Sequence, residues 1–328
     1  MERSFRTEFL LILMMGGHIM INQIIERQNE TSNILKLAAQ RYLYSFSKKI
    51  MGMQLIFSIP LMIIVSLLPV MFGNKDIFSM IIVSLSLFIT IFDVCFFNPV
   101  IEKNKTKAAK IQEDFDTDVF SLEWNEIKVD GRPNREDIHE FANKYRKLEP
   151  DFSSLKSWYP QSVKELPLPV GRIICQRTNL WWDALLRERF ISMVIIFALV
   201  LLMLLFIITL VIGLDSLKII TNIIAPFLPM LTFTLRNFND NKKAIKNIGI
   251  LKQKVEDLWI NTLRSIQDPI ELTRISRQLQ DEIFTHRNNS PLIFDWFYRF
   301  FKNKQESSSN YSANDLLDQY NRARISRP

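Results

Sequence analysis

The most uniform pattern in the chain is an uninterrupted apolar run from Phe190 to Ile212. It holds about 23 residues without a charge, and a helix of that length crosses a hydrocarbon layer of roughly 30 Å. A core helix of a water-soluble protein carries a polar stripe along one face, and this segment has none. The pattern therefore predicts a transmembrane helix.

A second apolar run, Leu217 to Leu235, follows the first after the short turn 213–216. Because that turn is too short to lead elsewhere, the two runs predict a transmembrane hairpin. An earlier pair has the same design, with Met51 to Phe72 and Ile77 to Phe97 joined by the turn 73–76. The sequence thus predicts four membrane spans in two hairpins.

The remaining residues predict helices outside the membrane. Apolar positions at helical spacing predict an amphipathic helix over Asn22 to Lys49. The first 19 residues have a basic start and a short apolar middle, so they are either an interfacial anchor or residues upstream of a true start at Met20. The predicted division is an N-terminal extension and amphipathic helix (1–50), hairpin 1 (51–101), a helical insert (102–189), hairpin 2 (190–236), C-terminal helices (237–304) and a polar tail (305–328). The serines at 307–309 indicate that the tail is flexible, and Leu316, Leu317 and Tyr320 allow one short amphipathic helix within it.

Lysine and arginine residues gather at the outer ends of the two hairpins. The hairpin turns offer only Lys75 and, just inside the fourth span, Lys218. By the positive-inside rule both termini and the insert are therefore cytosolic. Topology accounts for most of the net charge of +7, so we predict no long nucleic acid as a partner. The predicted fold class is an all-α membrane protein, with four transmembrane helices in two hairpins and a helical cytosolic domain.

Few residues offer catalytic or metal chemistry. Cys95 falls in an apolar run and Cys175 in a polar segment, so no disulfide is predicted. None of the three histidines, His18, His139 and His286, has a second histidine or a cysteine at helical spacing. Gly-rich phosphate loops, GxSxG elbows, HExxH and Walker patterns are absent. We predict that the protein is not an enzyme and holds no metal or cofactor.

Three polar residues in the predicted spans are candidates for lining a pore. Asp93 is a carboxylate within a span, where such groups usually face a bundle interior or a water path. Asn222 and Thr232 belong to the fourth span, which also contains the kinking residues Pro226 and Pro229. Packing within a helix bundle is the alternative for Asn222 and Thr232. Asp93 also lies near the cytosolic end of its span, where partial exposure lowers its cost.

Aromatic residues beside cations, outside the predicted spans, favour a nucleotide site. Arg177 and Arg287 are predicted to meet phosphate, while Trp296 and Tyr298 supply aromatic rings for stacking. Trp181 and Trp182 are better explained as interfacial anchors, because they directly precede the third span.

Two further patterns each leave two interpretations open. The acidic cluster 113–116 is either a metal or general-base group, or a helix surface and salt-bridge partner; nothing around it completes a catalytic arrangement. A heptad-like seam predicts either self-association through a short coiled coil or packing on the insert. Its members are Ala244, Ile248, Leu251, Val255 and Leu258.

Three strings together resemble a known family. They are IQEDFDTDVFSLEWN (Ile111 to Asn125), CQRTNLWWDALLRERF (Cys175 to Phe190) and HRNNSPLIFDWFYRFF (His286 to Phe301). The chain is similar to the SMODS-associated four-transmembrane (S-4TM) effector family over roughly Met20 to Lys304. The resemblance implies a bacterial antiviral effector in the inner membrane. A partner nucleotidyltransferase would make a cyclic oligonucleotide, and the effector would then permeabilise the membrane and kill the infected cell.

We therefore expect a homo-oligomer whose cytosolic part binds the nucleotide and whose four-span unit becomes a pore or disrupts the membrane. Two other classes remain open. A constitutive small channel or transporter subunit would conduct without nucleotide, and a membrane-anchored scaffold would conduct nothing. Replacing Asp93 and Asn222 with leucine separates these classes, because it should abolish a pore and leave a scaffold intact.

Overall fold

A computed structural model describes residues 22–58, 61, 64, 76–212, 224–265 and 267–326, and every regular element in these ranges is helical. In chain order the elements are α2 (Ile24–Arg27), α3 (Thr31–Ser58), α5 (Asp76–Phe92), the π-helical η1 (Asp93–Phe97), α6 (Asn98–Phe120), α7 (Glu126–Val129), α8 (Arg135–Arg146), the 3₁₀ turns η2 (Ser153–Leu155) and η3 (Gln161–Glu165), α9 (Leu168–Ile212), α11 (Ala225–Arg264), α12 (Pro269–Asn289) and α13 (Asp295–Ile325). The all-helical part of the predicted fold class is confirmed.

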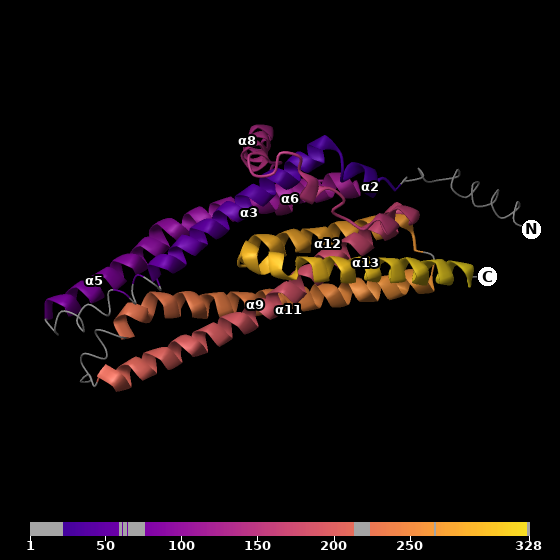
Figure 1. Ribbon diagram of the computed structural model, residues 1–328. Helices are drawn as coiled ribbons and strands as arrows, with labels where there is room; N and C mark the ends of the chain where they lie inside the picture. Colours follow the sequence, from indigo (N-terminus) through magenta and orange to yellow (C-terminus); the bar gives the residue numbers. More distant parts are fainter. Residues whose placement is uncertain are drawn as a thin grey trace, which may run out of the picture.

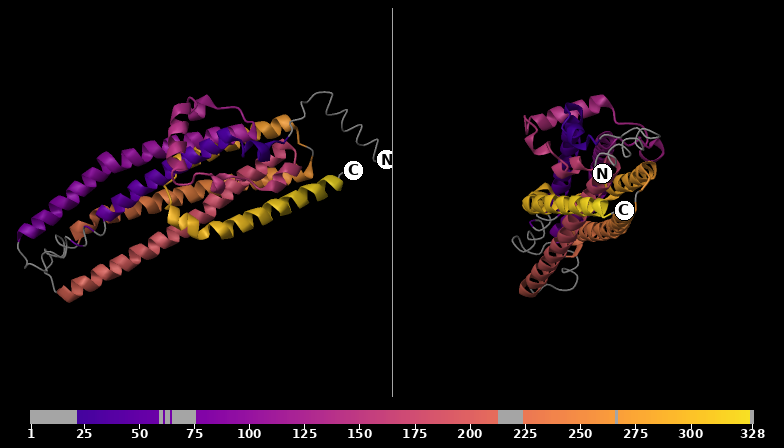
Figure 2. Two further views of the ribbon diagram at one scale, coloured as in Figure 1. Left: turned by 45° about the horizontal axis from the view of Figure 1, so that its top comes forward. Right: turned by 90° about the vertical axis from the view of Figure 1, so that its right-hand side faces the viewer.

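The molecule is elongated, with long helices extending to one end and shorter helices gathered at the other (Figure 1). We call residues 51–58, 61, 64, 76–101, 190–212 and 224–236 the arm, and the remaining described residues the head. The predicted domain boundaries at 50, 101, 189 and 236 fall inside α3, α6, α9 and α11 respectively. Each of these helices therefore continues from arm to head without a break. Figure 2 shows the same continuity from two further sides, with α13 lying along the head.

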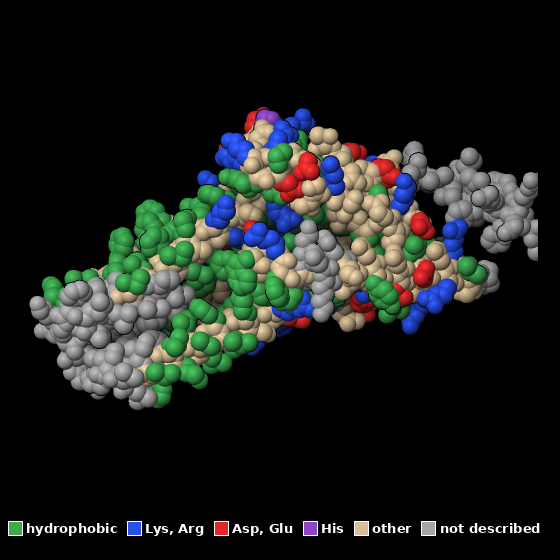
Figure 3. Space-filling model, in the orientation of Figure 1, with side chains coloured by type: hydrophobic (Ala, Val, Ile, Leu, Met, Phe, Trp, Pro, Cys, Tyr) green, Lys and Arg blue, Asp and Glu red, His purple; other side chains and the backbone are tan. Residues whose placement is uncertain are grey.

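Large apolar side chains cover the surface of the arm. Phe88 of α5 is 61% exposed, and Ile196, Met203 and Phe206 of α9 are 62%, 66% and 64% exposed. Figure 3 shows hydrophobic side chains over the arm and charged side chains gathered on the head. A contiguous apolar surface of this kind is costly in water and suits the interior of a bilayer.

One helix of the described residues is long and apolar enough to cross a membrane. It runs from Met80 to Phe120, and its most apolar window has a mean hydropathy of 2.4 with 22% of its residues buried. The second predicted span, Ile77 to Phe97, overlaps it. Most of the first predicted span and the beginning of the fourth lie outside the described residues, as does the predicted extension 1–19.

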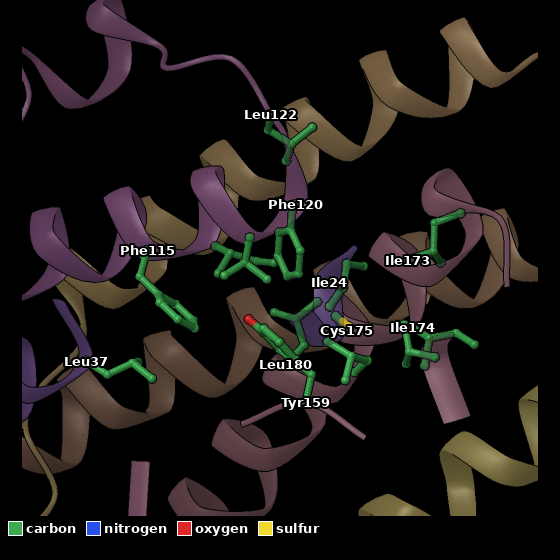
Figure 4. Close-up of a cluster of buried hydrophobic side chains, with 14 of the residues drawn as sticks. Ile24, Leu37, Phe115, Phe120, Leu122, Tyr159, Ile173, Ile174, Cys175 and Leu180 are labelled. Carbon is green, nitrogen blue, oxygen red and sulfur yellow. The ribbon is translucent and has the colours of Figure 1, made fainter. Parts of the chain in front are cut away.

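The core of the head joins segments that are far apart in the sequence. Ile24 of α2, Leu37 of α3 and Phe115 and Phe120 of α6 are fully buried. Tyr159, Ile173 and Cys175 add to the same cluster from the segment before α9 and from α9 itself (Figure 4). Burying a large apolar side chain contributes about 1.5–3 kcal/mol, so this cluster fixes how the five segments pack.

The heptad-like seam predicted in the C-terminal helices packs inside the chain. Ala244, Ile248, Leu251 and Val255 of α11 are all buried, and Leu251 and Val255 belong to the same core cluster as the insert. The interpretation as packing on the insert is therefore confirmed for this seam, and self-association through it is excluded in this conformation. Homo-oligomerisation by other surfaces stays a prediction.

The polar tail predicted from residue 305 is not a flexible extension. α13 continues without interruption from Asp295 to Ile325. Ala313, Leu316 and Leu317 are buried against the head, and the indole of Trp259 donates to Gln319 at 3.2 Å. The polar composition of this segment predicts disorder, but three buried apolar side chains at helical spacing outweigh it.

Candidate functional site

A cavity of about 140 Å³ lies where the arm meets the head, and helices of both predicted hairpins line it. Its walls include Asp93 of η1 and Thr232 of α11. Two of the three residues predicted to line a pore therefore meet at one cavity, although they are far apart in the sequence. The third, Asn222, lies outside the described residues. Because polar side chains are among its walls, a cavity of this size can hold several water molecules.

Asp93 is placed by an irregular turn of its helix. Pro99, at the start of α6, has no N–H to donate to the carbonyl of Cys95 and its ring crowds that carbonyl. The helix responds by widening into the π-helical turn η1, which begins at Asp93. Such turns are frequent at functional sites. Asp93 is only 8% exposed, so its carboxylate lies inside the helix bundle rather than toward the surroundings of the arm.

The cavity also carries charges that sequence reasoning assigned only to topology. Lys105 is 3% exposed and pairs with Glu102 at 2.7 Å. Arg236 and Asp240 of α11 line the same space. Cations and carboxylates from α6 and α11 thus face one cavity at the base of the arm.

A buried ion-pair network organises the head. Arg277 of α12 pairs with Glu113 at 2.6 Å, and Arg287 of the same helix pairs with Asp116. Gln280 donates to both carboxylates, at 2.8 Å to Glu113 and 3.0 Å to Asp116. The acidic cluster predicted at 113–116 is therefore a set of salt-bridge partners, but it is buried rather than on a helix surface. In the described part of the chain, no group of acidic, histidine or cysteine side chains is arranged to hold a metal.

Burial and charge oppose each other in this network. Burial raises the pKa of Glu113 to about 7, although Arg277 acts in the opposite direction. For Arg287, burial lowers the pKa, but Asp116 outweighs that effect, so the pKa of the guanidinium is raised. The network therefore contains a permanently charged arginine and a carboxyl group that titrates near neutral pH.

A second network joins α9, α11 and α12 just before the apolar part of α9. Arg187 donates to Asp183 at 2.8 Å, to Asn241 at 3.0 Å and to the carbonyl of Pro291 at 2.9 Å. His286 meets Asp183 at 2.5 Å. Although burial opposes ionisation, Arg187 and His286 hold the pKa of Asp183 well below its usual range.

Asp183, His286 and Ser290 are the residue types of a hydrolytic triad, but their geometry differs from one. The carboxylate of Asp183 lies 2.5 Å from Nε2 of His286, whereas the hydroxyl of Ser290 lies at nearly equal distances from both ring nitrogens, 3.3 Å from Nδ1 and 3.2 Å from Nε2, and so is aligned with neither. A triad requires the acid and the nucleophile on opposite ring nitrogens. Ser290 is also only 4% exposed. The arrangement fits a structural hydrogen-bond cluster.

The four residues predicted to bind a ligand lie in different surroundings. Arg177 pairs with Glu256 at 2.6 Å and donates to Ser312 at 3.0 Å. Arg287 is held by Asp116 as described, and Trp296 is 54% exposed. Within the part of the chain that the structure describes, no hydrogen bond, ion pair or ring contact joins any two of the four.

Among the four predicted ligand residues, Tyr298 lies beside both a second aromatic ring and a cation. Its ring lies 6.1 Å from the ring of Trp182, and the guanidinium of Arg41 lies 5.5 Å from its centroid. Arg41 lies 5.8 Å from Trp158 as well. Sequence reasoning counted Arg41 only as a charge flanking a span and did not consider Trp158. Their proximity depends on how α13 and the segment before α9 fold over α3.

These features define the class of protein: a helical protein with an apolar, membrane-compatible arm and an ion-paired polar head. The chain belongs to the SMODS-associating 4TM effector domain family, whose match covers residues 22–316. The predicted family is confirmed. The chain is also 28% identical over 299 residues to a protein of Bacillus cereus (strain VD146) described as a probable CBASS effector molecule. That alignment covers 86% of this chain and 94% of the relative. No solved structure matches the chain.

Proposed function

We propose that this protein is a membrane effector of a bacterial cyclic-oligonucleotide antiphage system. Binding of the nucleotide to the head makes copies of the chain assemble and permeabilise the inner membrane. The family match and the resemblance to a probable CBASS effector support an antiphage effector role. The observation that carries the membrane step is the continuity of α3, α6, α9 and α11 from head to arm. A rearrangement in the head would move helices in the membrane directly.

The proposed topology is four spans in two hairpins, with both termini and the insert in the cytosol. The exposed apolar surfaces of α5 and α9 support two of these spans, and the candidate membrane helix supports the second in particular. The distribution of lysine and arginine supports the orientation. In this topology the head faces the compartment in which a partner nucleotidyltransferase would release its product.

Activation requires that the ligand bind one state better than the other. A ligand with equal affinity for the resting and open states shifts nothing, and moving an equilibrium from 1:99 to 99:1 takes about 10⁴-fold differential affinity. The buried ion pairs of the head are suited to such discrete states. Breaking a pair leaves a buried charge without its partner, which is strongly unfavourable. In the open state Asp93, Thr232 and Asn222 line the path. The protein performs no chemical step and needs no metal or cofactor.

Dye leakage from liposomes containing the purified protein tests this proposal. We expect leakage only when one member of a panel of cyclic di- and trinucleotides is added. Leakage without any nucleotide would instead favour a constitutive channel or transporter subunit. Silence under every condition would favour a membrane-anchored scaffold.

A further inference from the structure

Arg41 of α3 lies between two aromatic rings from distant parts of the chain. Its guanidinium carbon is 5.8 Å from the ring centroid of Trp158, in the segment before α9, and 5.5 Å from that of Tyr298 on α13. All three side chains are half-buried. A guanidinium held by rings uses its flat faces for those contacts. Its edges, which carry the five N–H donors, stay available for other partners.

No carboxylate of the described residues takes up those donors. Arg41 forms no hydrogen bond or ion pair within these ranges, and its Nε is buried without a hydrogen-bond partner. The arginines of the neighbouring networks differ, since Arg187 and Arg287 each pair with an aspartate. A buried N–H donor without a partner is destabilising. Arg41 therefore has N–H donors that are available to a ligand.

The surroundings of Arg41 favour an anion. Asp295, whose carboxylate is under the influence of the charge of Arg41, already accepts from Lys48 at 2.6 Å and from Ser45 at 2.7 Å. Burial lowers the pKa of Lys48, Asp295 acts in the opposite direction, and the positive charges of Arg41 and Arg187 lower it further. Asp183 and Asp116 are engaged by His286, Arg187 and Arg287 as described.

A further aromatic surface adjoins this cluster. The ring of Trp182 on α9 lies 6.1 Å from the ring of Tyr298 and is tilted by 35° to it. Trp182 is half-buried, and aromatic faces of this kind accept stacked nucleobases irrespective of sequence. Arginine edges and aromatic faces together match the two parts of a nucleotide, the phosphodiester and the base.

We propose a phosphodiester-binding site formed by Arg41, Trp158, Tyr298 and Trp182. The edge of Arg41 donates hydrogen bonds to the phosphate oxygens, and the aromatic rings pack against the adjoining base. The assignment rests on the proposed function, in which the phosphodiester belongs to the cyclic oligonucleotide. A phospholipid headgroup carries the same chemical group and is the other source that the site would accept.

Occupation of this site would act on three segments together. Arg41 belongs to α3, which continues into the arm, and Tyr298 follows Phe297, whose ring packs 5.4 Å from that of Phe190. Phe190 is where the apolar part of α9 begins. A ligand that draws α3 and α13 together would therefore change the packing at the base of the arm.

Titration of the full-length protein, in detergent free of phospholipid, with the panel of cyclic di- and trinucleotides tests the site. We expect Arg41→Met and Arg41→Lys to weaken binding by about 10- to 100-fold, because neither side chain has a bidentate fork. Tyr298→Phe keeps the ring and should bind as the wild type does, whereas Tyr298→Leu should not. Arg299→Met removes an exposed cation one residue further along α13 and serves as the matched control.

Thermal unfolding of each variant separates recognition from folding. Arg41→Lys keeps a cation between the rings, so it should unfold as the wild type does and still lose affinity. If both Arg41 variants bind nucleotide with wild-type affinity, this site is wrong while the proposed function stands. If the wild type binds no nucleotide but binds short-chain phosphatidylglycerol through Arg41, the nucleotide assignment falls. If the wild type binds neither and nucleotide causes no leakage, both proposals fall.

Discussion

Asp116 and Arg287 form an ion pair although 171 residues separate them in the sequence. The side chain of Asp116 is 1% exposed and that of Arg287 13%, so both charges are largely removed from water. Asp116 also accepts from the hydroxyl of Tyr159 at 2.7 Å. The pair therefore fixes α12 against α6 and against the segment that precedes α9.

Removing one partner of this pair should be strongly destabilising. We expect Arg287→Met to lower the free energy of unfolding by about 3–5 kcal/mol, because it leaves the carboxylate of Asp116 buried without its cation. Thermal unfolding in detergent measures the effect. Arg274→Met, which removes an exposed arginine from the same helix, should leave the midpoint unchanged. A wild-type midpoint for Arg287→Met would show that the network does not hold the head together.

The raised pKa of Glu113 predicts a pH dependence of stability. Burial raises this pKa from 4.5 to about 7, so the folded protein binds the proton more tightly than the unfolded chain does. The contribution of Glu113 is therefore fully present below pH 4.5 and declines as the pH rises through about 7. The total loss is about 3 kcal/mol.

Glu113→Gln removes the titrating group and provides the reference. Arg277 keeps Asp281 as a partner at 2.9 Å in that variant. The unfolding midpoint of the wild type should fall relative to that of the variant as the pH rises from 4.5 to 8. A difference that is constant with pH would contradict the burial of an ionisable Glu113.

Two glycines in the long helices predict opposite responses to alanine. A Cβ on Gly171 would lie 2.9 Å from Val163 Cγ1 and 3.0 Å from Asn22 Nδ2, so Gly171→Ala should destabilise the head by roughly 1–3 kcal/mol. A Cβ on Gly249 meets nothing within 4 Å. Gly249→Ala should therefore stabilise α11 by up to about 1 kcal/mol through its higher helix propensity. Unfolding midpoints that move in the same direction would contradict the packing at Gly171.

The cavity at the base of the arm predicts which substitutions alter permeation. Asp93→Leu and Asn222→Leu should abolish nucleotide-dependent leakage while nucleotide binding persists, because they make the proposed path apolar. Ile196→Leu, on the exposed face of α9, is the control and should leak as the wild type does. Persistent leakage from the double leucine variant would place the path elsewhere or indicate rupture of the bilayer.

The family followed from the resemblance of three sequence strings, whereas periodicity and composition were enough to predict the helices and the apolar arm. They also identified Asp93 and Thr232, because a polar group within an apolar run is conspicuous in a single sequence. That the two residues share a cavity depends on the packing of η1 against α11, which no local pattern encodes.

The head was harder to predict because its decisive contacts are distant. Helical spacing shows that Asp116 shares a helix with Phe115, but it does not show that Arg287 is its partner. The same difficulty affects Arg41. The positive-inside rule is enough to explain a cation beside a predicted span, and the sequence does not show that Trp158 and Tyr298 lie next to it. In α13, Leu316 and Leu317 indicated only a short amphipathic helix within a flexible tail, because the surface that buries them is supplied by the rest of the chain.

Current across a planar bilayer, with nucleotide added to one side at a time, tests the central claim most directly. The protein is inserted in one orientation, and the activating cyclic oligonucleotide is added first to the side opposite the head and then to the side bearing it. We predict no current before addition, none after the first addition, and discrete current steps after the second. Current without nucleotide, or equal current from either side, would contradict an effector gated through its cytosolic head.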